Sequence, residues 1–416
     1  MQHDSLADHP GPVKRLGCAL AVSSASSPDI AAVVGSDVLP PARAKYVLQS
    51  LLQPLGLEPV LVDEPAATGP SLYWPSLPDS RVALDAQQLQ AAFAQVSGLA
   101  EQPSPHDRLG RFQASSLDAI AHPALSQWAR SLLDQLNQLV DRPAPLPGLS
   151  VYLTHDLDRV HPCEPMGLLG RARRNAIGLA RGNLAAAGEL GRWIASSGRF
   201  RSTVESIMRI EQSAGATGVY FFMSGPYSFR RYGARTGRRS RHLRSLLHMA
   251  RRYGHVVGLH GCAYSLERRN YDVQRQRLEG VLGEPIRWHR NHYLVYDGVR
   301  SPSLLAGAGL EVDSTVGFTM SNGFRAGLSW PYYLWDPQRD AASQVLEVPL
   351  VFMDGTTGRP VQQEWAQVYQ RLESALATGG AVAINFHMEH FVLDPEAVGR
   401  YKEMIRWLGD RGVRLG

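Results

Sequence analysis

The sequence contains few cysteines. Cys18, Cys163 and Cys262 are the only three in 416 residues, and no two of them form a CxxC pair. A disulfide framework needs an even set of cysteines at regular spacings, and a thiolate zinc site needs closely paired cysteines. The sequence therefore argues against both kinds of site.

Long apolar runs are also absent. Residues 1–10 are polar and acidic, without the basic start and apolar run of a signal peptide. No stretch reaches the roughly 20 apolar residues that a membrane-spanning helix requires. We therefore expect a cytoplasmic protein, and we leave open a peripheral contact with the inner membrane surface.

Composition and charge indicate two unlike parts. Hydrophobic residues make up 44% of the chain, and 416 residues exceed the usual size of one compact domain. The net charge is +5, yet residues 1–150 carry 9 Lys+Arg against 14 Asp+Glu, whereas the remainder carries 34 against 24. Nearly all of these cations are arginine, whose planar guanidinium suits phosphate and carboxylate groups.

Residues 1–147 are predicted to form a smaller, accessory mixed α/β domain. Amphipathic patterns predict helices at 43–52, 84–99 and 122–140, and a short strand at 59–62. The segment DRLGRF lies between the last two helices. Prolines in DRPAPLPG, residues 141–148, then interrupt the pattern and mark a domain boundary.

In the second domain, residues 148–416, apolar strands alternate with helices. Strands are predicted at 151–155, 218–223, 256–260, 286–290, 310–313, 346–350 and 381–387. Helices are predicted at 203–214, 242–253, 272–282, 302–308 and 360–377. This alternation predicts parallel strands with right-handed crossovers, in a barrel or a doubly wound sheet. Polar residues at several strand ends favour the barrel, where such ends build the active site.

Two arginine-rich insertions interrupt the alternation, at 166–201 and 230–252. The second contains nine arginines and no acidic residue. Both insertions are either solvated helical faces or a surface for anionic lipid headgroups or a phosphorylated carrier. Nucleic acid is disfavoured as a partner, because aromatic residues that stack on bases are not interleaved with these arginines.

The stretch VYLTHDLDRV, residues 151–160, leads a predicted strand directly into a histidine and two aspartates. Asp156 and Asp158 are two positions apart and so share a face of an extended chain. Two carboxylates in one site suit metal binding or acid–base chemistry. A strand end followed by a solvated turn is the alternative interpretation.

Four later predicted strands also end in polar or ionisable residues. They are VVGLHGCAYS with His260 and Tyr264, IRWHRNHYL with His289, Arg290 and His292, EVDSTVGF with Asp313, and AVAINFHMEHF with His387, Glu389 and His390. A single histidine is usually a core residue, but several at strand ends beside two aspartates indicate a site. Oxygen and imidazole ligands suit a hard or borderline divalent ion, which activates water for hydrolysis of an amide or ester.

In this order, THDLD, GLHGCAYS, RNHYL, DSTVGF and NFHMEHF resemble the motifs of the polysaccharide deacetylase family, the NodB-homology enzymes of carbohydrate esterase family four. The resemblance covers residues 149–400 and extends to an intracellular bacterial branch with an accessory N-terminal domain. It implies a distorted (β/α)7 barrel that removes acetyl groups from N-acetylated sugars with a divalent metal, commonly Zn2+. By the same resemblance, Asp156 matches the general base, Asp158 and His260 match metal ligands, Arg290 matches the arginine that orients the base, and His387 matches the general acid.

Two positions depart from the family pattern. Leu157 separates two aspartates that are adjacent in the family, and Tyr264 stands where the family has its second metal histidine. His292 is our first candidate for the missing ligand, and His289 is the next.

Further residues are expected to contact the substrate: Tyr264, Tyr293, Asp313 and Arg325. By the resemblance, Tyr293 contributes a backbone N–H to the oxyanion. Arg325, in the segment GFRAG, contacts a substrate carboxylate or phosphate, or else pairs with an acid in the barrel wall.

Three functions follow from these observations. The leading hypothesis is a metal-dependent de-N-acetylase in surface polysaccharide or glycolipid biosynthesis. Its substrate would be a lipid-linked or nucleotide-linked glycan precursor, whose phosphates suit the arginine-rich insertions. The alternatives are a catalytically silent glycan-binding or scaffold protein and a phosphate-directed metallohydrolase.

Overall fold

The protein is described from a computed structural model. It covers residues 29–62, 69–73, 75–76, 80–101, 111–112, 120–139, 147–160, 165–180, 197–225, 240–355 and 361–416. Cys18, Cys163, most of DRPAPLPG and much of the two arginine-rich insertions lie outside these ranges, so the predictions made for them stay predictions.

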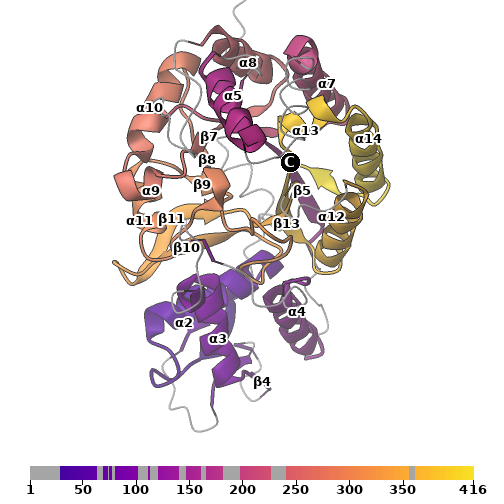
Figure 1. Cartoon of the computed structure of the whole chain (residues 1–416). Coiled ribbons are helices and arrows are strands. Elements are labelled where there is room, and N and C mark those ends of the chain that lie inside the picture. Colours follow the sequence, from indigo (N-terminus) through magenta and orange to yellow (C-terminus); the bar gives the residue numbers. More distant parts are fainter. Residues whose placement is uncertain are drawn as a thin grey trace, which may run out of the picture.

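A four-stranded sheet with three helices forms the N-terminal part (Figure 1). The strands are β1 (Asp29–Val33), β2 (Glu58–Leu61), β3 (Ser71–Tyr73) and β4 (Arg81–Ala83), in the order β2-β1-β3-β4, with β1 and β2 parallel. The helices are α2 (Pro41–Leu52), α3 (Ala86–Val96) and α4 (Ala124–Asn137). Asp85 caps α3 by accepting a hydrogen bond from the N–H of Gln88 at 2.6 Å. The predicted helices and strand of this part are confirmed.

The second sheet is curled, mostly parallel, and ordered β10-β11-β9-β8-β7-β6-β5-β13-β12, with β14 beside β5. Its strands are β5 (Leu149–Leu157), β6 (Val219–Phe222), β7 (Val256–Gly261), β8 (Trp288–Asn291), β9 (Val312–Asp313), β10 (Tyr332–Asp336), β11 (Ala341–Glu347), β12 (Leu350–Met353), β13 (Gly380–Asn385) and β14 (Arg414–Leu415). Within the described part of this second sheet, only β10 and β11 pair antiparallel. The expected distorted (β/α) barrel is thereby confirmed.

Helices surround this sheet (Figure 1). They are α5 (Pro165–Ala180), α7 (Phe200–Ser213), α8 (Arg241–Arg252), α9 (Ser265–Arg268), α10 (Tyr271–Leu282), α11 (Ser301–Gly307), α12 (Val361–Leu376), α13 (Met388–Leu393) and α14 (Glu396–Gly409). Short 3₁₀ turns lie at Gln53–Leu55, Leu99–Glu101, Ser197–Arg199 and His292–Leu294. None of the helices in the described part of the chain has the length and apolar character needed to span a bilayer.

One predicted strand was wrong. Residues 346–350 do not form a single element but join the end of β11 to the start of β12. Pro349 has no N–H for a sheet ladder, and the N–H of Val348 donates to Asp313 O at 2.8 Å. The hairpin of β10 and β11, and the short helix α13, were not predicted.

Alternation along the strands separates two apolar layers. Tyr152 packs inside the barrel with Phe221 and Trp288, whereas Val151 and Leu153 pack outward in the layer shared with the helices. Successive residues of a strand face opposite sides. Thr154 and Asp156 therefore face the interior, and β5 carries the first motif of the sequence into the barrel.

The N-terminal part is bound to the barrel by polar contacts. Tyr46 donates to Tyr333 O at 2.9 Å, and Trp330 Nε1 donates to Ser50 O at 2.8 Å. Arg325 forms a bidentate pair with Glu101, with N···O distances of 2.7 and 2.6 Å, and also donates to Gly317 O. Substrate contact by Arg325 is thereby corrected: its guanidinium pairs with an acid, supplied by the N-terminal part rather than by the barrel wall.

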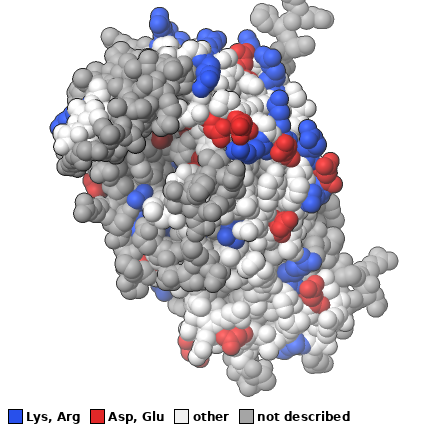
Figure 2. Space-filling model, turned by 45° about the vertical axis from the view of Figure 1, so that its right-hand side comes forward, with Lys and Arg blue, Asp and Glu red and all other residues white. Residues whose placement is uncertain are grey.

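Charges of both signs alternate on the surface that carries α12 and α14. Figure 2 shows Lys and Arg interspersed with Asp and Glu there. On α8, Arg251 pairs with Glu284 and Arg252 with Glu205. Contact of the arginine-rich insertions with a membrane surface stays a prediction.

We expect Glu101→Gln to destabilise the protein. It leaves the Arg325 guanidinium, whose side chain is 2% exposed, without its counter-charge. Removing one partner of a buried pair costs about 3–5 kcal/mol, whereas the exposed Arg43–Asp340 pair should contribute about 0–1 kcal/mol. Urea unfolding of Glu101→Gln and the control Arg43→Ala measures both, and equal small losses would contradict the buried role of the pair.

Candidate functional site

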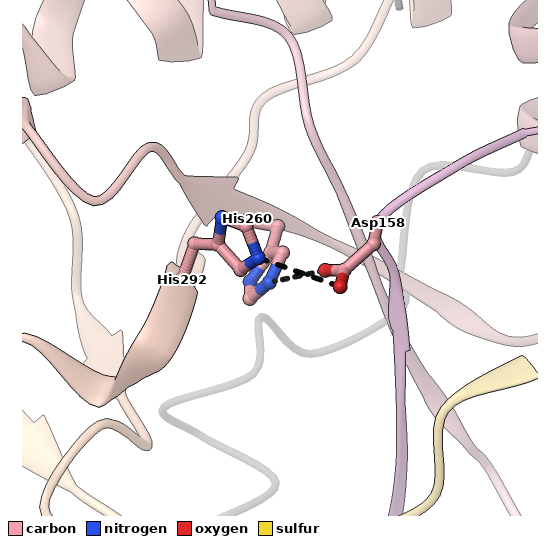
Figure 3. Close-up of side chains that lie close together, drawn as sticks. All are labelled: Asp158, His260 and His292. Atoms are coloured by element: carbon pink, nitrogen blue, oxygen red, sulfur yellow. Dashed lines mark hydrogen bonds and ion pairs between the residues drawn. The ribbon is translucent and has the colours of Figure 1, made fainter. Parts of the chain in front are cut away.

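Three side chains converge beyond the ends of neighbouring strands. Asp158 follows β5, His260 lies near the end of β7, and His292 begins the 3₁₀ turn after β8. One ligand atom from each lies within 4.8 Å of the other two. Asp158 Oδ1 is 3.1 Å from His260 Nε2, and its Oδ2 is 3.4 Å from His292 Nε2 (Figure 3). The structure thus brings together the three residues for which metal binding was predicted.

The donor atoms of this group fit a divalent cation. His260 Nδ1 lies 3.0 Å from the carbonyl oxygen of Arg290, which only accepts, so Nδ1 carries a proton and Nε2 is the ring nitrogen turned toward Asp158. Burial would lower the pKa of His260, but Asp156 and Asp158 raise it, so a metal at Nε2 would displace a proton. Burial lowers the pKa of His292, which favours the neutral imidazole that binds metals. One carboxylate and two imidazoles form a three-ligand set that leaves a position for water.

The backbone after His292 is strained. Tyr293 and Leu294 adopt the left-handed region, with φ of 62° and 51°. Each such non-glycine residue costs about 1–3 kcal/mol, and such residues cluster at functional sites. The Tyr293 ring stacks beside His292, with centroids 4.2 Å apart, and is 37% exposed. Tyr293 therefore lies at the rim of the site, where substrate contact was predicted.

Arg290 holds Asp156 inside the barrel. Its Nη1 donates to Asp156 Oδ1 at 3.1 Å, to Thr154 Oγ1 at 2.8 Å and to Asn385 Oδ1 at 2.6 Å. Nε and Nη2 donate to the carbonyl and hydroxyl of Ser314. This arrangement agrees geometrically with an arginine that orients the predicted base.

Asp354, directly after β12, is a site residue that the sequence analysis missed. It accepts from His387 Nδ1 at 2.6 Å and from the N–H of His387 at 3.0 Å, and it lies 3.2 Å from His390 Nδ1. His387 Nε2 consequently faces Asp156, 4.0 Å from Oδ2. The missed signal was an acid after an apolar strand, the same pattern that singled out Asp156.

Electrostatics give Asp156 and His387 opposite protonation states. Burial alone would raise the pKa of Asp156, but His260, Arg290 and His387 outweigh it and lower that pKa. Burial would lower the pKa of His387, but Asp354 raises it well above the usual value. An ionised carboxylate and a protonated imidazole therefore face each other across the site.

His289 and Asp313 lie on the opposite side of the sheet from Arg290. His289 Nδ1 is 2.8 Å from Asp313 Oδ1, which also accepts from Thr315 Oγ1 at 2.6 Å. Both side chains are at most 1% exposed. This corrects two expectations: His289 does not replace the missing ligand, and Asp313 is a buried partner of His289 rather than a substrate contact.

Tyr264 and Glu389 complete the strand-end motifs. Tyr264 is half-buried at the N-cap position of α9, and its contact with substrate stays a prediction. Burial, with a smaller contribution from Asp158, raises the pKa of Glu389 to about 7. The last motif therefore adds a carboxyl group that holds a proton more readily than an ordinary glutamate.

Behind β5 lies a second polar cluster that no motif predicted. Glu211 accepts from Tyr220 at 2.7 Å and from Tyr401 at 2.5 Å, and its Oε1 is 2.6 Å from His155 Nε2. His155 Nδ1 lies 3.0 Å from Phe386 O. The cluster fixes β5 from the side opposite Asp156.

The fold and the strand-end residues define the class: a distorted (β/α) barrel with histidines and carboxylates at one end. No protein-family model matches the sequence, and no curated protein sequence matches it. Among solved structures, the chain is similar to a Mycobacterium smegmatis protein assigned to the polysaccharide deacetylases, with 17% identity over 67% of this chain and 89% of that one, and a TM-score of 0.42.

Two further solved structures are similar to the chain, with lower TM-scores. A family 4 carbohydrate esterase from Streptomyces lividans in complex with acetate is 15% identical over 65% of this chain and 93% of that one, with a TM-score of 0.32. A family 4 pseudoenzyme from Bacillus anthracis is 10% identical over 65% and 64%, also with a TM-score of 0.32. These low sequence identities and TM-scores say nothing of the chemistry, which rests on the chain's own side chains.

The pairing of His387 with Asp354 predicts a shifted titration. Because Asp354 raises the pKa of His387 well above the usual 6.5, the imidazole should stay protonated at neutral pH. Its contribution to stability is then present below pH 6.5 and lost as the pH rises through the higher folded pKa. Proton NMR of the ring should show this, and Asp354→Asn should move the midpoint downward. An unchanged midpoint would contradict the assigned cause.

Proposed function

We propose that the protein is a metal-dependent hydrolase that removes an N-acetyl group from a sugar. The observation that carries the proposal is an ionised Asp156 and a protonated His387 that face each other beside the group of Asp158, His260 and His292. The sugar amide as substrate is supported by the order of the five motifs.

The side chains divide the reaction between them. Asp156, oriented by Arg290, accepts a proton from the attacking water, and His387 donates its Nε2 proton to the departing nitrogen. The C–N bond of the amide breaks, water is consumed, and acetate and the free sugar amine leave. One carboxylate and two imidazoles are a donor set found in zinc sites, and a zinc ion held by Asp158, His260 and His292 would supply Lewis-acid polarisation of the acetyl carbonyl.

The substrate class is a glycan precursor of surface polysaccharide or glycolipid biosynthesis. The arginine-rich insertions support a lipid or nucleotide linkage and contact with the membrane surface, and a cytoplasmic location stays part of the proposal. A phosphate-directed hydrolase is less well supported, because Arg290 and Arg325 are committed to Asp156 and Glu101.

Acetate release tests the proposed reaction. Incubation with N-acetylated oligosaccharides should release acetate, a chelator should stop the release, and added zinc should restore it. Asp156→Asn should lower kcat by about 10²–10⁴-fold, the usual contribution of a general base. The surface change Asp340→Asn is the matched control and should leave kcat unchanged. A fully active Asp156→Asn enzyme would contradict the role of Asp156.

A catalytically silent glycan-binding protein is the second candidate, favoured by Tyr264 at the place of a metal histidine. Zinc titration of the chelator-treated protein separates the two functions. The proposed hydrolase should bind about one zinc ion per chain, and His292→Ala should weaken binding because a three-ligand set loses one member. No zinc uptake at micromolar excess would favour the silent protein.

A further inference from the structure

His292 lacks the hydrogen bond that orients the other site histidines. His260 Nδ1 is bonded to Arg290 O, and His387 Nδ1 to Asp354. His292 Nδ1 is buried and has no hydrogen-bond partner among the residues described. Metal-binding histidines usually hold their second ring nitrogen in such a bond. The orientation of His292 therefore depends on the contact of its Nε2 with Asp158 and on packing.

Two rings pack against His292: that of His260, with centroids 5.1 Å apart, and, closer, that of Tyr293. The Tyr293 ring lies 4.2 Å from the His292 ring, centroid to centroid, at an interplanar angle of 40°. Because Tyr293 has a φ of 62°, its placement needs support from outside the turn.

That support comes from Arg111, 182 residues earlier in the chain. Its Nη1 lies 3.5 Å from Tyr293 O, and its guanidinium lies 5.7 Å from the centroid of the Tyr293 ring. Arg111 thus contacts both the main chain and the ring of the residue that packs on His292. It belongs to DRLGRF, a segment to which the proposed reaction gives no role.

The next residue, Phe112, also contacts the barrel. The Phe112 ring lies 6.1 Å from Phe318, and the Arg325 guanidinium lies 5.6 Å from Phe112. Arg325 also holds Glu101 in the buried pair described above. Arg111 and Phe112 therefore lie against residues of the barrel next to the turn that carries His292.

We propose that Arg111 is a positioning residue for the metal group, acting through Tyr293 on the orientation of His292. The N-terminal part of the chain thereby completes the site. The proposal rests on the metal group of the proposed function, but it concerns metal affinity rather than the reaction.

Cobalt titration of the chelator-treated full-length protein tests this role. Arg111→Ala should weaken Co2+ binding about 10–100-fold, as loss of an outer-shell partner typically does, and should alter the visible spectrum that reports ligand geometry. Arg111→Lys should recover only part of the loss, because an ammonium group does not reproduce the planar contact. Arg43→Ala removes another contact between the two parts of the chain, to Asp340, and should bind Co2+ like the wild type.

Tyr293→Gly tests the contribution of the ring separately from that of the backbone conformation. Glycine adopts the positive φ without strain, so this variant keeps the turn and loses only the stacked ring. It should show the same weakened Co2+ binding, with no general loss of stability because the strain at positive φ is relieved. Wild-type affinity in Arg111→Ala or in Tyr293→Gly would overturn the proposal. A wild-type protein that binds Co2+ but releases no acetate would instead refute the proposed function and leave this inference standing.

Discussion

The buried guanidinium of Arg290 is the interaction on which the rest of the site depends. An arginine without solvent contact is tolerated only when its donors are satisfied, because an unpaired buried charge is strongly destabilising. Here the partners come from β5, from β13 and from the residue after β9, and the guanidinium also lies 4.5 Å from the Phe221 ring centroid. The strand ends must converge on one point inside the barrel to supply these partners.

The same residue couples Asp156 to the group of Asp158, His260 and His292. The side chain of Arg290 holds Asp156, and its main-chain carbonyl accepts the Nδ1 proton of His260. A shift of β8 along its neighbours would therefore disturb both groups at once. On the other side of β5, the cluster around Glu211 holds His155 and prevents that strand from moving independently.

The sequence could predict what depends on local pattern. Strand periodicity located β5, β6, β7 and β13, and polar residues at the ends of β5, β7 and β13 lie close together because parallel strands present their carboxyl ends at one edge. Asp354 was missed because Pro349 hid the boundary between β11 and β12. The opposite facing of His289 and Arg290 follows from strand alternation only once the limits of β8 are known.

Contacts between residues far apart in the sequence could not be predicted from local patterns. Glu101 and Arg325 are separated by 224 positions, and neither periodicity nor spacing identifies such partners. Arg111 is a similar case, since its contact with Tyr293 exists only when both parts of the chain have folded. The partners of Arg111, Phe112 and Arg325 could not be predicted because each contact joins residues far apart in the sequence.

The separate partners of Asp156 and His387 explain how two opposite charges remain available for chemistry. Left alone, an ionised carboxylate and an imidazolium 4.0 Å apart would close into a direct ion pair, and each would be neutralised by the other. Arg290 holds Asp156 from inside the barrel, and Asp354 holds His387 from the end of β12. Each charge is thus balanced from behind, so neither group depends on the other alone for its counter-charge.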